Sequence, residues 1–225
     1  MTQMDAARAG IVTSQMKAVA ATEGRPEDYI REGVALGTIA IPANPAHTSL
    51  APVGVGAGLR TKVNVNLGIS GDIQNAPEEW EKVTLAERFG ADAIMDLSNS
   101  GKTRGFRRSL IEKTPLMVGT VPIYDAIGYC DKPLVELEAE DFLKVVEAHA
   151  EDGVDFMTIH AGFNRAVLKN LLETKRLTNV VSRGGSLLFA WMMARDEENP
   201  FYEHFDEVLE ILHEHDVTIS LGDAL

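Results

Sequence analysis

The sequence predicts an α/β fold with a parallel sheet, in the form of a (β/α)8 TIM barrel. Apolar, β-branched runs recur along the chain, each followed by a polar turn and a segment with helical periodicity, which is the pattern of successive βα units. Polar residues gather at the carboxyl end of each run, where barrel enzymes place their active sites. An open doubly wound sheet is the alternative, but the glycine-rich turn expected after its first strand is missing.

Composition indicates a globular protein with an acidic surface. With 45% apolar residues, the 225-residue chain can bury a core. The 34 acidic residues outnumber the 21 basic ones, and no basic run offsets the formal charge of -13, which argues against nucleic-acid binding. Neither an apolar leader nor a run of 18 apolar residues is present, so we expect a cytoplasmic protein with no membrane contact. The single cysteine, Cys130, excludes an internal disulfide and a metal site built from paired cysteines of this chain.

Residues 1–60 lack the alternation of strands and helices, and we expect them to form an extension that packs on a barrel core spanning 61–225. The six strands of this core are expected at 61–68, 92–98, 116–122, 154–162, 178–182 and 217–223. The clearest helices are expected at 76–90, 140–153 and 201–216. The first of these has acidic residues in its opening turn and Gly90 where a helix should end.

Six strands do not close an eight-stranded barrel. Because the last expected strand lies at the end of the chain, two strand edges would stay unpaired. Either the sequence is a fragment, or another chain supplies the missing strands, or the architecture is not a barrel. We expect a fragment that stops before the last strands, with exposed edges that favour a homodimer.

Each expected strand end carries a polar side chain or a polarisable methionine, in some cases with neighbours of the same kind. This arrangement suits a small polar ligand at the mouth of a barrel. In chain order these residues are Asn64 and Asn66, Met95 with Asp96 and Ser98, Tyr124, His160, Ser182 with Arg183, and Asp223. Taken singly, Tyr124 and Met95 are more typical of core packing, and a core role is equally open for His160. The two asparagines need hydrogen-bond partners because they alternate in a buried strand.

The stretch SRGGS, residues 182–186, has the composition of an anion site. Gly184 and Gly185 would open a helix whose first amides lack partners, and Arg183 would add a charge-assisted pair to a phosphate. The alternative is a tight turn with Arg183 in solvent. Three other histidines, at 204, 213 and 215, lie on an acidic helical segment, and we interpret them as part of a solvated face with no metal-binding role.

Together these motifs resemble those of the thiamin pyrimidine synthases, the ThiC family, and of their paralogues, the anaerobic 5-hydroxybenzimidazole synthases. The resemblance covers essentially the whole chain and rests on TQMDAARAGIVTSQM, IPANPAH, TKVNVNLG, GADAIMDLS, GTVPIY, GVDFMTIHAG, VSRGGS, ENPFYEHFDEVLEI and SLGD, in that order. It implies a (β/α)8 barrel and a radical reaction of 5-aminoimidazole ribonucleotide, of the carbon–carbon lyase type. In that reaction a [4Fe-4S] cluster and an electron donor reduce S-adenosylmethionine to an adenosyl radical.

By motif match, the resemblance implies which residues bind the ribonucleotide. They are Asn66, Met95, Tyr124, His160, Ser182, Arg183, Gly184 and Asp223. Among them Tyr124 and His160 are implied to take part in catalysis. The SRGG stretch is expected to hold the phosphate end.

The chain departs from the family pattern in two ways. The family continues past SLGD with an Arg-Pro-Gly stretch, a glutamate, two histidines that bind zinc or iron, and three cluster-binding cysteines. None of these is in the 225 residues, so we expect this chain alone to bind no cluster or metal and to be inactive. Thiamin enzymes also read DLSTGG and SLGDGL where this chain has DLSNSG at 96–101 and SLGDAL at 220–225.

The second departure bears on the product. Because both changes adjoin the expected substrate residues, we expect synthesis of 5-hydroxybenzimidazole, for the lower ligand of cobalamin. Synthesis of the thiamin pyrimidine, a phosphomethylpyrimidine, from the same ribonucleotide is the alternative. A fragment that binds the ribonucleotide without catalysis is a hypothesis of another class.

Overall fold

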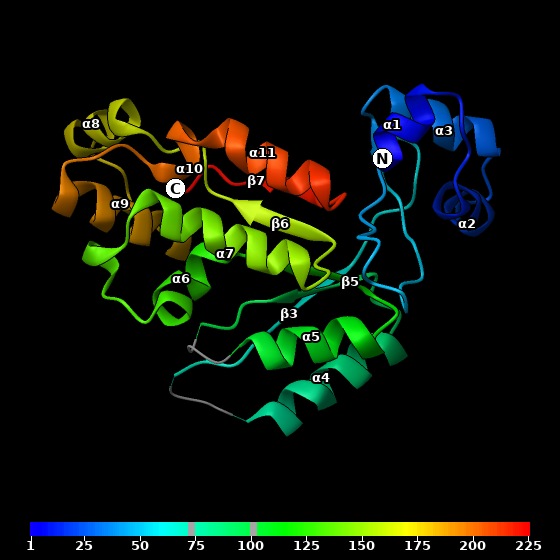
Figure 1. Cartoon of the computed structure of the whole chain (residues 1–225), viewed down its shortest axis with the longest axis horizontal. Helices are drawn as coiled ribbons and strands as arrows, with labels where there is room; N and C mark the ends of the chain where they lie inside the picture. Colours follow the sequence, from blue (N-terminus) through cyan, green and yellow to red (C-terminus); the bar gives the residue numbers. More distant parts are fainter. Residues whose placement is uncertain (72–74, 100–102) are drawn as a thin grey trace.

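The computed structural model describes residues 1–71, 75–99 and 103–225. Its centre is a five-stranded parallel sheet in the order β3-β4-β5-β6-β7, with helices along one face (Figure 1). The strands are β3 (Asn64–Leu67), β4 (Ala93–Asp96), β5 (Met117–Thr120), β6 (Phe156–Ile159) and β7 (Thr218–Leu221). The α/β class with a parallel sheet is therefore confirmed.

The connections between strands are helical. They comprise α4 (Ala76–Arg88), α5 (Arg104–Lys113), α6 (Pro122–Cys130), the 3-10 turn η1 (Leu134–Glu136), α7 (Ala139–Glu151), α8 (Arg165–Glu173), α9 (Arg183–Arg195), α10 (Pro200–Glu203) and α11 (Phe205–Glu214). The helices expected at 76–90 and 140–153 are confirmed by α4 and α7. The segment expected as one helix over 201–216 is broken at His204 into α10 and α11.

The strand expected at 178–182 is wrong. These residues form no strand, because β7 takes the position beside β6, with Phe156 opposite Thr218 and Ile159 opposite Leu221. The valines that suggested a strand find no sheet to join, and Val181 is 69% exposed. Ser182 instead caps the amino end of α9 by accepting a hydrogen bond from the Gly185 amide at 3.1 Å.

In the described part of the chain the sheet is open, with β3 and β7 at its edges. Five strands do not close a barrel, so the barrel remains a prediction for a longer chain.

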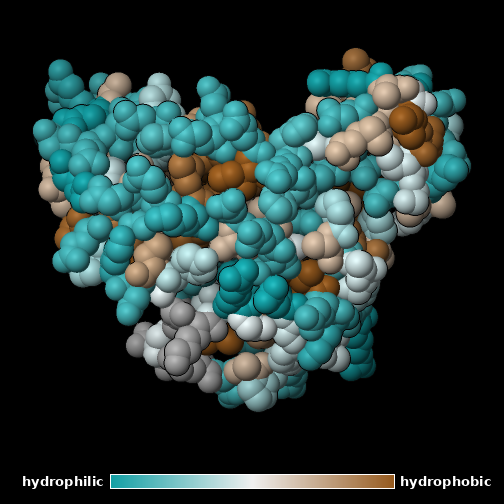
Figure 2. Space-filling model, in the orientation of Figure 1, coloured by the Kyte–Doolittle hydropathy of each residue, from teal (hydrophilic) through white to brown (hydrophobic). Residues whose placement is uncertain are grey.

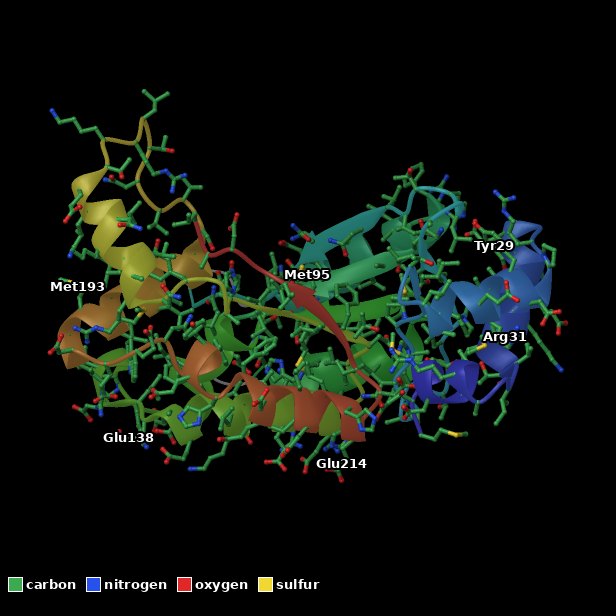
Figure 3. The ribbon with its side chains drawn as sticks, turned by 90° about the horizontal axis from the view of Figure 1, so that it is seen from above. Tyr29, Arg31, Met95, Glu138, Met193 and Glu214 are labelled. Atoms are coloured by element: carbon green, nitrogen blue, oxygen red, sulfur yellow. The ribbon has the colours of Figure 1, made fainter. Side chains whose placement is uncertain are left out.

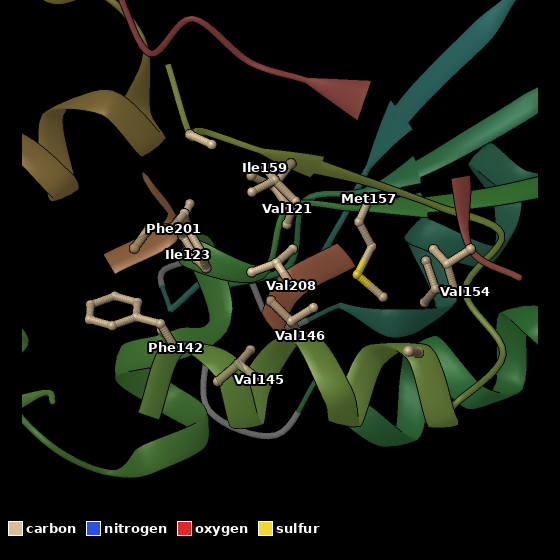
Figure 4. Close-up of a cluster of buried hydrophobic side chains, with 14 of the residues drawn as sticks. Val121, Ile123, Phe142, Val145, Val146, Val154, Met157, Ile159, Phe201 and Val208 are labelled. Atoms are coloured by element: carbon tan, nitrogen blue, oxygen red, sulfur yellow. The ribbon is translucent and has the colours of Figure 1, made fainter. Parts of the chain in front are cut away.

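The two faces of the sheet differ in what covers them. The face toward the helices is mainly apolar, and Ile94, Val118, Met157 and Ile159 on it are all 0% exposed. Figure 4 shows this core where Val145 and Val146 of α7 meet Met157 and Ile159 of β6. The opposite face is open, and a hollow of about 500 Å³ lies over it, lined in part by Asn64, Met95 and Phe156.

The first sixty residues build a separate hydrophobic cluster. It consists of α1 (Gln3–Arg8), α2 (Ser14–Glu23), α3 (Glu27–Ala35) and an antiparallel pair, β1 (Ile39–Ala40) with β2 (Val55–Gly56). Met16, Val19 and Ile30 are fully buried there. In Figure 2 a notch in the outline separates these helices from α11.

The extension is joined to the sheet at the amino ends of β5 and β6. The backbone amide of Asn44 and the imidazole of His47 donate to the two carboxylate oxygens of Asp155, at 3.0 and 2.7 Å. The same carboxylate accepts from the amide of Val118 at 2.8 Å. This attachment leaves the carboxyl ends of the strands free.

Among the described residues, no helix has the length and apolarity needed to cross a membrane.

Candidate functional site

Six of the eight expected site residues gather where β5, β6 and β7 end and α9 begins. Tyr124 lies in the first turn of α6, which follows β5, and His160 follows β6 directly. Ser182, Arg183 and Gly184 form the cap and first turn of α9, and Asp223 lies just past β7. Parallel strands place their following residues at one edge of the sheet, which is why side chains distant in sequence meet here.

His160 is the buried centre of this cluster, with 6% of its surface exposed. Its Nε2 lies 3.2 Å from the hydroxyl oxygen of Ser182, and its backbone carbonyl accepts from the side-chain amide of Asn199 at 2.8 Å. The second ring nitrogen, Nδ1, is buried and has no hydrogen-bond partner in the described part of the chain. A buried polar atom of this kind is expected to meet a ligand or an ordered water.

Burial lowers the pKa of His160, and the nearby charge of Asp223 opposes this shift only in part. The imidazole is therefore neutral at neutral pH. A neutral ring that shares Nε2 with Ser182 presents a single donor or a single acceptor at Nδ1. The site can thus direct one hydrogen bond at a ligand without adding a positive charge.

The two glycines of SRGGS make room for other parts of the site. A Cβ atom at Gly184 would lie 2.5 Å from Cε1 of His160. One at Gly185 would overlap the carbonyl group of Ala224. Because Ser182 already satisfies the Gly185 amide, an anion here would rely on Arg183 and on the remaining amides of the first turn.

Arg183 carries the charge of the site. Its guanidinium carbon lies 5.2 Å from the centre of the Tyr124 ring, a cation–π arrangement. The side-chain amide of Asn99 faces the guanidinium, and in the amide orientation that satisfies hydrogen bonding its oxygen accepts from both terminal nitrogens, at 2.8 and 2.6 Å. Within the described ranges no carboxylate forms an ion pair with Arg183, so its charge is free to bind an anion.

Asn66 and Met95 lie apart from this cluster. They are opposite one another on β3 and β4, on the open face of the sheet, and Figure 3 labels Met95 there. Asn66 is exposed and accepts a hydrogen bond from Asn64 at 2.9 Å, so the expected burial of both asparagines is wrong. No hydrogen bond joins this pair to His160 among the residues that the structure describes.

Asp96 and Ser98 do not face the ligand side. Asp96 is 4% exposed on the helix side of β4, and the Ser98 backbone amide donates to it at 3.0 Å. Burial raises the pKa of Asp96, against the hydrogen bonds from Ser98. The pair fixes the loop after β4, which carries Asn99. Residues 100 and 101 of the DLSNSG stretch lie outside the described residues.

A buried ionic network beneath α6 was not apparent from the sequence. Arg107, 1% exposed, donates to Asp125 at 3.2 Å and to Asp152 at 2.9 Å. His149 donates from Nε2 to Asp125 at 3.2 Å, and burial together with the charge of Arg107 lowers its pKa to about 4. Asp125 follows Tyr124 in sequence, so this network fixes the helical turn that carries the Tyr124 ring.

Comparison with known proteins identifies the family of this chain. The family described as radical SAM ThiC matches residues 2–225. The chain belongs to the radical SAM ThiC family. Relatives named phosphomethylpyrimidine synthase are 60% identical in Clostridium tetani and in Pelotomaculum thermopropionicum, each over 223 residues, which is 99% of this chain and 49% and 52% of theirs. One from Campylobacter jejuni is 55% identical over 224 residues, 100% of this chain and 52% of its own.

The resemblance to ThiC is confirmed, and the chain spans about half the length of the curated relatives it matches. The relatives' names do not support the expected synthesis of 5-hydroxybenzimidazole. They favour the alternative, synthesis of the thiamin pyrimidine.

The residues of this chain do not fit a [4Fe-4S] cluster by themselves. A cluster of this kind is held by several thiolates, and the sequence has one cysteine. Cys130 is partly buried, and burial raises the pKa of its thiol, which disfavours the thiolate. Within the described residues no group of three or more histidine, cysteine or acidic side chains could hold a metal ion.

Proposed function

We propose that the complete protein is a phosphomethylpyrimidine synthase that acts on 5-aminoimidazole ribonucleotide in thiamin synthesis. The observation that carries this proposal is the 60% identity to proteins of that name across 99% of the chain. The geometry of the site supports it, because an arginine that forms no ion pair within the described residues and a neutral histidine suit a phosphorylated, uncharged heterocycle. The DLSNSG and SLGDAL sequences, which favoured 5-hydroxybenzimidazole as the product, do not outweigh this identity.

Within that function, residues 1–225 supply the ribonucleotide site. Arg183 binds the 5′-phosphate with two-pronged, charge-assisted hydrogen bonds, and the Tyr124 ring supports the guanidinium from one side. His160 directs the hydrogen bond of Nδ1 at the sugar or the imidazole, held in place by Ser182. Gly184 lets the histidine ring approach, and Asp223 offers an exposed carboxylate beyond β7.

The open face of the sheet forms the floor of the proposed site. Asn66 and Met95 lie there, beside the hollow of about 500 Å³. Asn66 supplies an amide to the ligand and Met95 an apolar surface.

The radical chemistry requires groups that these residues do not provide. A [4Fe-4S] cluster, S-adenosylmethionine and an electron donor would generate the radical, and a divalent zinc or iron ion is a further expected component. We propose that residues outside this half-length chain bind them. On this proposal residues 1–225 bind the ribonucleotide but do not turn it over, and the complete protein works as a homodimer.

Anaerobic turnover of the full-length protein tests the function. The protein is reconstituted with iron and sulfide, given the ribonucleotide, S-adenosylmethionine and a reductant, and the product is identified by mass. We expect the phosphorylated pyrimidine, and expect Arg183→Ala to lower its yield at subsaturating substrate while Asn170→Ala, an exposed change on α8, leaves the yield unchanged. Formation of 5-hydroxybenzimidazole would contradict the proposed product and favour 5-hydroxybenzimidazole synthesis. Binding without turnover would indicate a non-catalytic ribonucleotide-binding protein.

A further inference from the structure

The side-chain amide of Asn99 faces the Arg183 guanidinium. We assign the amide the orientation that satisfies hydrogen bonding, in which both terminal nitrogens of Arg183 donate to its carbonyl oxygen, at 2.8 and 2.6 Å. The Tyr124 ring faces the same guanidinium at 5.2 Å. Two contacts from different elements therefore define the direction of an otherwise exposed arginine side chain.

The backbone beneath Asn99 is held firmly. Its amide donates to the carbonyl of Ile69 at 3.0 Å, and the Ile69 amide donates to the hydroxyl of Ser98 at 2.8 Å. Gly68 lets the two loops approach, since a Cβ atom there would lie 2.6 Å from the amide nitrogen of Ser98. The Asn99 side chain thus projects from a position fixed by hydrogen bonds to two strand ends.

The chemistry of the acceptor matters as much as its position. A guanidinium has five N–H donors and keeps its charge under all physiological conditions. A carboxylate at this place would orient the group but would also neutralise it and compete with a phosphate. The neutral amide of Asn99 uses two donors and leaves the charge and the other donors available.

We propose that Asn99 is a positioning residue that aims Arg183 at the phosphate of the bound ribonucleotide. This inference rests on the proposed function, because it needs a phosphorylated substrate at Arg183. On this proposal Asn99, the third residue after β4, helps the site to bind the phosphorylated ligand more tightly than the unphosphorylated one.

Calorimetric titration of the full-length protein tests the role. The probes are 5-aminoimidazole ribonucleotide and the nucleoside that lacks its phosphate. We expect Asn99→Ala to weaken ribonucleotide binding about three- to tenfold, the net size of one ordinary hydrogen bond, and to leave nucleoside binding unchanged. Asn99→Asp, which is nearly isosteric, is expected to weaken it more, by about tenfold or more, because the new carboxylate pairs with Arg183.

A double-mutant cycle separates positioning from a general loss of structure. Because Asn99 acts through Arg183, adding Asn99→Ala to Arg183→Ala is expected to cause no further loss of ribonucleotide affinity. Asn170→Ala, an exposed asparagine on α8, serves as the matched control and should bind as the unmodified protein does.

The outcomes distinguish the two proposals. Unchanged affinity in both Asn99 variants, equal losses for nucleotide and nucleoside, or additive effects with Arg183→Ala would overturn the role of Asn99 alone. If the unmodified protein binds the ribonucleotide no tighter than the nucleoside, the phosphate site itself is wrong, and both proposals fall.

Discussion

Asp216 shows how one side chain joins the extension to the rest of the molecule. Its two carboxylate oxygens accept from the backbone amide of Gln3 at 3.2 and 3.0 Å, at the edge of a cavity of about 280 Å³ between α1 and α11. Burial raises its pKa to about 6. The folded protein therefore holds this proton more tightly than the unfolded chain, and ionisation weakens the fold as the pH rises from about 4 to 6.

We expect Asp216→Asn to stabilise the protein above pH 6. The amide oxygen can still accept from Gln3, and the cost of burying a charge is removed. With a discount for solvent screening of this partly exposed group, the gain in the free energy of unfolding is about 1 kcal/mol at pH 8 and close to zero at pH 4. Urea denaturation at the two pH values measures the difference.

The control for this change is Asp131→Asn. Asp131 is exposed and has the same left-handed backbone, with φ of 51° at both positions. Asparagine favours that conformation, so this control isolates the backbone contribution, which should be equal at both pH values. A gain at Asp216 that does not grow with pH would contradict the assignment of its pKa.

At the residue scale, the sequence predicted which residues gather at one edge of the sheet, but not which side chains contact one another there. Tyr124, His160 and Asp223 could be found because polar residues that follow apolar strands must meet at one edge of a parallel sheet. The contact of Asn99 with Arg183 could not be found, since it depends on how two loops bend toward each other. Its only signal was the DLSNSG sequence beside an expected substrate residue.

Among the elements, the segment containing Asn44 and His47 fixes the extension beneath the sheet. His47 donates from one ring nitrogen to Asp155 and from the other to the carbonyl of Thr114 at 3.0 Å. Although burial acts against it, the hydrogen bond and charge of Asp155 raise the pKa of His47. The imidazolium and the carboxylate are both fully buried, so each depends on the other.

Removing this carboxylate should therefore be costly. We expect Asp155→Ala to lower the free energy of unfolding by about 3 kcal/mol or more, because it leaves His47 and two backbone amides without their acceptor. Glu147→Ala, an exposed acidic residue on α7, is the control and should change stability little. Chemical denaturation measures both, and equal effects of the two substitutions would rule out the anchoring role of Asp155.

The predicted strands and helices were confirmed where the spacing of apolar residues in the sequence matched the buried face of the element. The strands with apolar side chains on the helix-covered face formed as expected, as Ile94 and Val118 illustrate. Residues 178–182 have the composition of a strand, but β7 occupies the place beside β6. Strand formation depends on an available partner, which composition does not reveal.

At the scale of the whole molecule, the open sheet agrees with a chain of about half the relatives' length. At its edges, Leu221 of β7 is 68% exposed and Val63, just before β3, is 55% exposed. Closure into a barrel would cover these side chains. The barrel remains a prediction from the strand pattern, and the described residues form an open five-stranded sheet.

The structure of the full-length protein with bound 5-aminoimidazole ribonucleotide would decide whether this edge of the sheet is the substrate site. We expect the phosphate to lie within hydrogen-bond distance of the Arg183 guanidinium, with Nδ1 of His160 facing the sugar or the imidazole. A ribonucleotide bound away from both residues, for example between α1 and α11, would contradict the site.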